Sequence, residues 1–191
     1  MQENFFYKYN NKLYVKEVYS DTIYLFNDSE LEFEPHFVID VGDRLITPEA
    51  RSKYDGNEIG RNFMNPIYLF EFGDFIFYGF VYEMIFKIPQ PEERLYGYIG
   101  SKKDDFQVMY NLKEGIIDDL DGGPNIMPLT TKDDNTVVAV VDAFKLKNYI
   151  LSTRFINSSP KYPEKKKELE KLAESLKETD NPVLVLVKLK K

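Results

Sequence analysis

Residues 67–80 read IYLFEFGDFIFYGF, and this stretch decides the fold class. Two runs rich in aromatic residues, 67–72 and 75–80, flank the pair Gly73-Asp74. Aromatic and β-branched side chains favour strands, and a two-residue loop that begins with glycine is typical of a type II′ turn. The stretch therefore predicts an antiparallel β-hairpin.

Similar runs lie on both sides of this hairpin. In residues 22–26 both alternating faces are apolar, which predicts a sheet that is covered on both sides. Residues 42–65 are rich in Gly, Asp, Asn, Arg and Pro and are expected to form a long connection. The other predicted strands are residues 13–19 and 31–41 before the hairpin, and 94–100, 106–110, 127–131 and 136–141 after it.

The sequence period changes after residue 141. Asp142 is a suitable N-cap for a short helix that ends at Ile150. A second helix is expected from the Ser158-Ser159-Pro160 segment to about Lys177. It should dock on the β body, because one of its faces carries a stripe at helical spacing: Leu169, Leu172, Ala173 and Leu176.

The chain ends on an apolar run. Asp180-Asn181-Pro182 should stop the second helix, because the residue before a proline is biased away from helical geometry. Residues 183–187 are continuously apolar and should form a terminal strand that pairs within a sheet.

These elements form units of a recurring kind. Four-stranded antiparallel units that are apolar on both faces are typical of β-propeller blades, and we place them at residues 5–41, 66–112, and 126–141 plus 183–189. Residues 142–180 would be a helical insertion. We therefore expect a mostly β single domain over residues 1–191: a partial β-propeller of about three blades with a C-terminal helical segment and a closing strand.

Two motifs resemble a known family. Residues 115–124, GIIDDLDGGP, are followed by Pro128, and residues 176–187 contain Asn181-Pro182 before the apolar run. They resemble the last blade and the closing segment of an uncharacterised family of bacterial six-bladed β-propellers related to the NHL-repeat type. The motif residues under this resemblance are Asp118, Asp119, Asp121, Gly122, Gly123, Pro124, Pro128, Asn181 and Pro182.

The resemblance implies that the chain is the C-terminal portion of a longer protein, either truncated or excised. Full-length members are roughly twice as long and usually begin with an export or lipoprotein signal, which implies that relatives reach the cell envelope. Met1 to Tyr9 lacks the basic start and apolar stretch of such a signal, so the chain as written is expected to be cytoplasmic.

Composition excludes several classes of function. No apolar run reaches the ~18 residues needed to span a bilayer. A net charge of −7 disfavours nucleic-acid binding, and the only basic candidates, Lys165 to Lys167 and the tail of Lys188, Lys190 and Lys191, are expected to be solvated. The absence of cysteine removes disulfides, thiol nucleophiles and cysteine metal sites.

The acidic loop is the strongest candidate site. Asp118, Asp119 and Asp121, beside Gly122-Gly123, have the oxygen ligands that calcium prefers. They lack the spacing and the distant glutamate of an EF-hand loop. A turn in which the aspartates accept backbone N–H bonds and the glycines take positive φ is the favoured interpretation, so we expect no metal.

Other candidates are weaker. His36 is the only histidine, so it cannot belong to an ordinary zinc site or to a Ser-His or Cys-His dyad. Glu92 and Glu93, between Pro91 and Arg94, are expected to form a solvated turn. No phosphate-binding or dinucleotide motif is present, and we expect no catalytic residue and no cofactor.

Two functions fit these observations. The first is a non-enzymatic binding or interaction module for a small molecule, a glycan or a protein. The second is a fragment of a propeller hydrolase or lyase whose active site lies mainly in blades outside this chain. Because about three blades cannot close a ring, self-association through open blade faces is also expected.

Overall fold

The computed structural model describes residues 3–84 and 94–190. The chain divides into two compact units. The first is Met1–Lys113 together with Asp133–Asn135, and the second is Glu114–Lys132 together with Thr136–Lys191.

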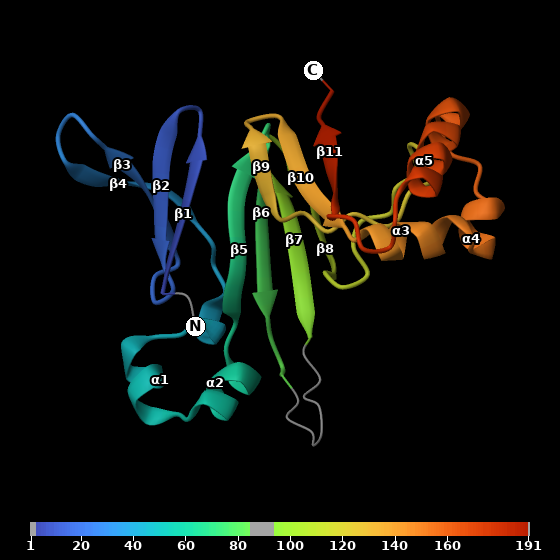
Figure 1. The fold of residues 1–191 in the computed structure, drawn as a ribbon. Coiled ribbons are helices and arrows are strands. Elements are labelled where there is room, and N and C mark those ends of the chain that lie inside the picture. The colour runs from blue at the N-terminus through green and yellow to red at the C-terminus, as the bar shows by residue number, and fades with distance from the viewer. Residues whose placement is uncertain (1–2, 85–93, 191) are drawn as a thin grey trace. The chain divides into compact units, whose positions relative to one another are not determined.

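The first sheet of the first unit is a four-stranded antiparallel meander (Figure 1, blue). Its first two strands meet at Asn10-Asn11, where φ is 50° and 57°. Asparagine tolerates this left-handed region, and a pair of such residues is typical of a tight hairpin turn. The strands are β1 (Asn4–Tyr9), β2 (Lys12–Glu17), β3 (Thr22–Asn27) and β4 (Glu32–Val38).

The second sheet is also a four-stranded meander (Figure 1, green) and contains the predicted hairpin. Phe72 pairs with Phe75 across the turn, and Gly73 has a φ of 51°. The predicted two-residue hairpin is therefore confirmed. The strands are β5 (Asn65–Phe72), β6 (Phe75–Val81), β7 (Leu95–Ser101) and β8 (Gln107–Asn111).

The connection between the two sheets contains short helices that the sequence analysis did not predict. They are η1 (Gly42–Arg44), α1 (Pro48–Lys53) and α2 (Gly56–Asn62). Thr47 caps α1, and Asp55 with Glu58 forms a capping box at α2. Ile46 and Ile59 are buried in a small apolar cluster beneath them. Charged and turn-forming residues in 42–65 thus mark helix ends as well as loops.

The two sheets share an apolar core. β1 lies beside β5, and the covered face of the first sheet contains Phe5, Tyr14 and Ile23. In the second sheet Phe77 and Tyr78 are buried on opposite faces of β6. This arrangement brings Glu71, near the end of β5, into contact with side chains of the first sheet.

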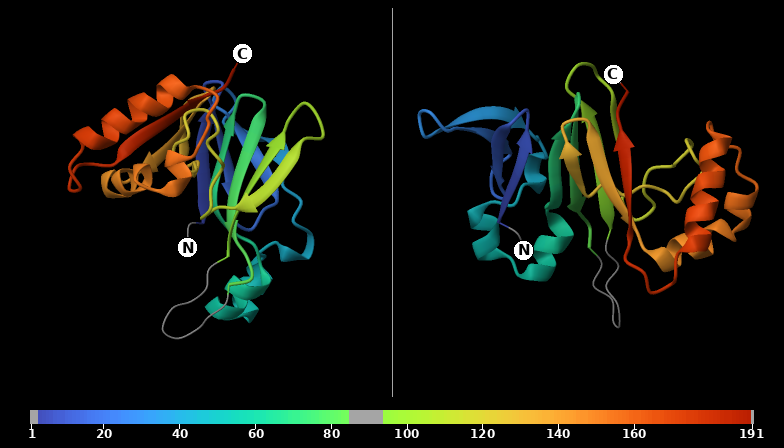
Figure 2. Two further views of the ribbon diagram at one scale, coloured as in Figure 1. Left: turned by 90° about the vertical axis from the view of Figure 1, so that its right-hand side faces the viewer. Right: turned by 45° about the horizontal axis from the view of Figure 1, so that its top comes forward.

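The second unit combines a three-stranded antiparallel sheet, in the order β11-β10-β9, with three helices. The terminal strand pairs with β10 from Val183 to Lys188, as expected. Figure 2 shows α5 beside α3. The elements are β9 (Thr130–Asp133), β10 (Thr136–Val141), α3 (Ala143–Ile150), α4 (Thr153–Ile156), α5 (Pro163–Ser175) and β11 (Val183–Lys188).

The second predicted helix was expected to dock on the β body, but α5 packs on α3 instead. Ala173 is fully buried, whereas Leu172 is 40% exposed. Lys147 of α3 donates through Nζ to the backbone oxygens of Ala173 and Leu176. The helix thus docks on α3 through its smallest stripe residue and through its C-terminal carbonyls, which attract cations.

The expected mostly β class is confirmed by these three antiparallel sheets. Within the described ranges they form neither a closed barrel nor a closed propeller. No helix among these residues is long and apolar enough to cross a membrane. The single-domain organisation and the blade boundaries stay predictions.

Candidate functional site: a buried carboxylate beside an apolar pocket

Glu71 is a buried acid in β5, a strand that is otherwise apolar and aromatic after Asn65 at its start. It lies one residue before the end of β5, and its side chain is fully buried. Because side chains alternate along a strand, Glu71 shares a face with Leu69 and lies opposite Ile76 of β6. A carboxylate in this position needs hydrogen-bond donors and a compensating charge.

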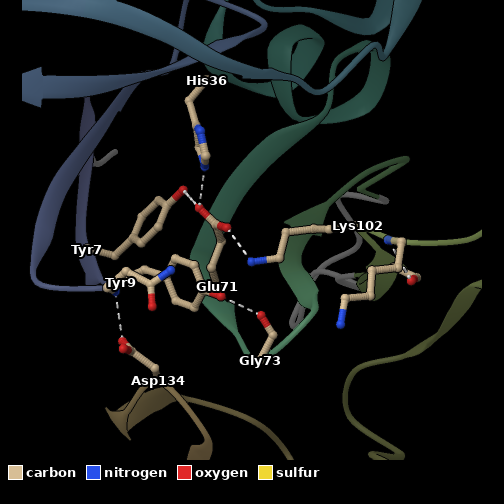
Figure 3. A network of polar contacts seen from close by, with 10 residues as sticks. Tyr7, Tyr9, His36, Glu71, Gly73, Lys102 and Asp134 are labelled. Carbon is tan, nitrogen blue, oxygen red and sulfur yellow. Dashed lines mark hydrogen bonds and ion pairs between the residues drawn. The ribbon is translucent and has the colours of Figure 1, made fainter.

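Three side chains supply these donors (Figure 3). The Tyr7 hydroxyl donates to Glu71 Oε1 over 2.7 Å, and His36 Nε2 lies 2.9 Å from the same oxygen. Lys102 Nζ donates to Glu71 Oε2 over 2.7 Å. The three donors come from β1, β4 and the residue after β7, so the cluster joins both sheets of the first unit.

The electrostatic environment keeps Tyr7 as a donor. Burial first, and then the charge of Glu71, raises the pKa of Tyr7 far above its ordinary value. Burial also raises the pKa of Tyr14, whose ring stacks on Tyr7 with centroids 5.1 Å apart. His36 lies between Tyr14 and Phe37, at 4.4 and 4.2 Å between ring centroids. Aromatic rings therefore hold two of the three donors in place.

A second layer of contacts fixes Lys102. Its Nζ lies 3.8 Å from the centroid of the Tyr9 ring, a cation–π contact. The Tyr9 hydroxyl donates to the backbone oxygen of Gly73 over 2.6 Å, and the Asn10 amide donates to Asp134 Oδ1 over 3.0 Å. The Lys102 side chain is 15% exposed and that of His36 is 26% exposed, so these two members of the cluster reach solvent.

A pocket of about 340 Å³ adjoins the cluster in the first unit. It is lined by residues 37–41 at the end of β4 and by the Glu71-bearing face of the β5–β8 sheet. Ile76, Gly100 and Gln107 continue the cross-strand row that begins with Glu71, and all three line the pocket. The next row contributes Tyr78, Tyr98 and Met109.

Lys102 belongs to both features, since it binds Glu71 and also lines the pocket. Its charge is balanced by Glu71, so the pocket wall is mainly apolar and aromatic. Both Glu71 oxygens already accept hydrogen bonds, and the carboxylate is shielded from solvent. The arrangement therefore suits binding and orientation of a ligand better than proton transfer by Glu71.

Lys16 is a second buried charged residue in this unit. Its Nζ donates to the backbone oxygens of Glu17 and Ser20 over 3.1 and 2.6 Å. Burial lowers the pKa of Lys16 to about 8, although the charge of Asp21 opposes this effect. Its donors are satisfied by a turn of its own sheet, which is a structural arrangement.

The acidic loop lies in the second unit, and its aspartates bind backbone amides. Asp118 Oδ1 accepts from the amides of Leu120 and Asp121 at 2.9 and 3.3 Å. Asp121 Oδ1 accepts from Gly123 at 2.8 Å. Burial first, and then the neighbouring Asp118, raises the pKa of Asp121 to about 6.

Two other residues of this loop, Asp119 and Gly122, contact the connection between α4 and α5. Asp119 Oδ2 lies 2.7 Å from Lys161 Nζ, and this hydrogen bond lowers the pKa of Asp119. Gly122 has a φ of 77°, and a Cβ there would lie 2.8 Å from Ser158 Oγ, so glycine is required twice over. In residues 3–84 and 94–190 no group of three or more His, Asp or Glu side chains is placed to hold a metal ion.

The other motif residues are dispersed in the second unit. Gly123 and Pro128 are buried, Pro124 is half-buried, and Asn181 and Pro182 are exposed where the chain enters β11. The structure does not gather them into one site.

Of the remaining charged candidates, two lysines of α5 have local partners and two glutamates lie outside the described ranges. Lys165 pairs with Glu168 at 2.9 Å, and Lys166 donates to backbone oxygens of residues 156 and 158. Glu92 and Glu93 lie outside the described residues.

Sequence reasoning missed the Glu71 cluster. The one available signal was a single acid, Glu71, within the aromatic strands of the hairpin, outside its Gly73-Asp74 turn. Lys102 gave none, because it stands in a charged turn beside Lys103. His36 was a weak candidate, and the structure places its Nε2 2.9 Å from Glu71 Oε1.

The comparisons with known proteins indicate a fold but no activity. No curated protein matches the chain. A solved structure of a protein from Bacteroides fragilis NCTC 9343, described as exported, matches with a TM-score of 0.64 and 17% identity. The match covers 97% of this chain and 49% of that one, so the chain spans about half the length of this neighbour.

The family comparison corrects the expected relationship. Residues 1–188 match the family described as "Domain of unknown function (DUF4934)", and no NHL-repeat family was found. The assignment of residues 115–124 and 176–187 to an NHL-related six-bladed propeller family is therefore wrong. An Asp-rich turn followed by Gly-Gly-Pro satisfies backbone amides in many folds, which makes it a poor family marker. The chain belongs to the DUF4934 family.

Proposed function

We propose that this chain is a non-enzymatic binding module and that the pocket beside Glu71 binds a small, largely apolar ligand. The observation that carries the proposal is the pocket itself. Its volume of about 340 Å³ lies within the range of small-molecule sites. Its lining combines aromatic rings with a few polar groups, which is the composition such sites commonly have.

The lining also restricts the ligand. Tyr78, Phe80 and Tyr98 can pack against a ring or a flat apolar body. Gln107 and Ser101 offer hydrogen bonds that can orient it. Because the charge of Lys102 is balanced by Glu71, a neutral ligand fits better than an anion. A small aromatic molecule or a sugar ring meets these conditions.

A hydrolase or lyase fragment is the second candidate. The convergence of Tyr7, His36 and Lys102 on one carboxylate favours it, since such groups can exchange protons. The burial of Glu71 and the saturation of both its oxygens favour binding instead. Turnover of p-nitrophenyl esters or glycosides that is lost in Glu71→Gln would support the enzyme.

The wider architecture and the compartment are also proposals. Two four-stranded meanders with β1 beside β5 support a blade-type arrangement with open outer faces, and hence self-association.

The exported description of the solved neighbour supports a role of relatives in the cell envelope. Fractionating cells that produce the native protein, followed by immunodetection, tests the compartment.

A fluorescent probe tests the pocket. N-phenyl-1-naphthylamine is neutral and aromatic, and its emission rises in apolar surroundings. Met109→Trp places a bulky ring at the pocket, whereas Val108→Trp adds the same ring on the opposite face of β8. We expect saturable binding to the wild type and to Val108→Trp, and at least about tenfold weaker binding to Met109→Trp.

Equal titrations of the two variants, or a wild-type signal that does not saturate, would refute the pocket. Both substitutions are at partly exposed positions of the same strand, so their effects on folding should be similar. Circular dichroism checks that they are.

A further inference from the structure

The outer face of the β1–β4 sheet is apolar and open. In one cross-strand row Leu13 lies between Lys8 and Phe26, and Phe26 pairs with Phe33. The adjacent row contains Phe6, Val15, Tyr24 and Pro35. Phe6 is 62% exposed and Phe33 58% exposed.

This pattern is unusual for an antiparallel sheet with one covered face. Such a sheet normally alternates apolar residues toward the core with polar residues toward water. Here Phe5, Tyr7 and Tyr14 already fill the covered face, yet the other face is apolar as well. Contiguous apolar surface of this kind marks an interaction site.

The turn between β3 and β4 extends the face. Leu31 is 76% exposed and has a φ of 56°. The left-handed region costs a branched residue such as leucine free energy, and an exposed leucine gains no packing there. The β3–β4 turn sets this φ, whereas the exposure of Leu31 is accounted for if its side chain contacts a partner.

Charge at the two ends of the face identifies the partner. Lys8 lies at the end near the β1–β2 turn, and Glu17 lies at the opposite end, paired with Asn4. Neither Lys8 nor the Glu17 carboxylate forms an ion pair within the described residues. When two such faces meet about a two-fold axis that crosses the strands, Lys8 of each copy lies near Glu17 of the other.

We propose that this outer face docks on the same face of a second copy of the chain. The inference rests on the proposed role as a binding module with open sheet faces, and it specifies the face and the partner. The contact is self-complementary in apolar surface and in charge.

Light scattering after size exclusion measures the mass directly. We expect twice the 22.5 kDa of one chain for the wild type. Phe33→Asp should weaken association at least about thirtyfold and give single-chain mass at micromolar concentration. Leu151→Asp, a control at an apolar position of the second unit that is even more exposed than Phe33, should leave the dimer intact.

Charge reversal tests the two-fold geometry by sedimentation equilibrium. Lys8→Glu alone, or Glu17→Lys alone, should weaken association by about tenfold, and the double reversal should restore it. A wild-type monomer at high concentration, or a dimer unaffected by Phe33→Asp in a folded protein, would overturn the proposal. Loss of association in the double reversal as well would refute the two-fold pairing.

These outcomes are separable from those of the pocket. Phe33→Asp leaves every pocket-lining residue in place, so its affinity for N-phenyl-1-naphthylamine at the pocket should be unchanged. Met109→Trp in turn should keep the dimer mass. A monomeric wild type that still binds the probe refutes only the docking face, and a dimer without probe binding refutes only the pocket.

Discussion

The buried ion pair of Glu71 and Lys102, within the second sheet, gives the sharpest test of what stabilises the Glu71 cluster. Its N–O distance is 2.7 Å, with Glu71 fully buried and Lys102 15% exposed. Removing one partner of a buried pair costs about 3–5 kcal/mol, because the other charge is left without compensation. We expect Glu71→Leu and Lys102→Met each to lose this amount of unfolding free energy.

The double variant should lose much less than the sum of the two. It contains neither charge, and its remaining cost is the lost acceptor of Tyr7 and His36, about 1–3 kcal/mol. The two substitutions should therefore be coupled by at least about 3 kcal/mol. Urea denaturation followed by circular dichroism supplies the four free energies.

A neighbouring exposed pair is the matched control. Lys103 lies 2.8 Å from Asp74, but their side chains are 70% and 50% exposed. The equivalent cycle of Asp74→Asn and Lys103→Met should show far weaker coupling. Costs at Glu71 and Lys102 that add within about 0.5 kcal/mol would refute the reasoning, since independent sites add to that degree.

Three further predictions concern the second unit. Ala173→Leu should lose about 1–3 kcal/mol of unfolding free energy in chemical denaturation, because it overpacks the α3–α5 contact. Leu172→Ala, at a position that is 40% exposed, should lose less than about 1 kcal/mol. A larger loss in Leu172→Ala than in Ala173→Leu would mean that a different face of the helix is buried. The raised pKa of Asp121, about 6, means that the contribution of this carboxyl to stability falls as pH rises from about 4 to about 6. Asp121→Asn should therefore be more stable than the wild type above pH 6, by about 1 kcal/mol after allowance for solvent screening, and equal to it near pH 4, as thermal melts across pH can check. Calcium titrated calorimetrically into the protein should give only heat of dilution, and stoichiometric binding would contradict the turn interpretation of this aspartate and of Asp118 and Asp119.

The sequence was sufficient for most of the strands, because their signals are local. The Gly73-Asp74 turn has a glycine at the position that needs positive φ, and aromatic runs flank it. The strand at Asn4–Tyr9 was not predicted, although its blade was expected to start at residue 5. Its pairing depends on the Asn10-Asn11 turn, whose left-handed residues are asparagines rather than the more recognisable Asn-Gly.

The cluster at Glu71 could not be predicted, because its members are distant in the sequence. His36 is 35 residues from Glu71 and meets it only when the two sheets pack. Lys102 is 31 residues away and meets it only when β5, β6 and β7 pair in the second sheet. Charge and polarity favour exposure for each of them when considered alone. Only the folded arrangement satisfies the charges and hydrogen bonds of all three residues together. The pocket is likewise formed by segments that are distant in the sequence, so it has no sequence signature.

The acidic loop illustrates the opposite case. The hydrogen bonds of Asp118 and Asp121 to backbone amides two and three residues away are local, and the sequence predicted bonds of this kind. The contact of Asp119 with Lys161 is distant in sequence and was not predicted.

Amide chemical shifts test the binding function most directly. In a ¹H–¹⁵N spectrum of the labelled protein titrated with N-phenyl-1-naphthylamine, we expect saturating shifts centred on Gly100, Gln107 and Met109, which line the pocket. The amides of the acidic loop at Asp118 and Asp121 should not move. Shifts that are absent, or that centre anywhere other than the pocket lining, would contradict the account.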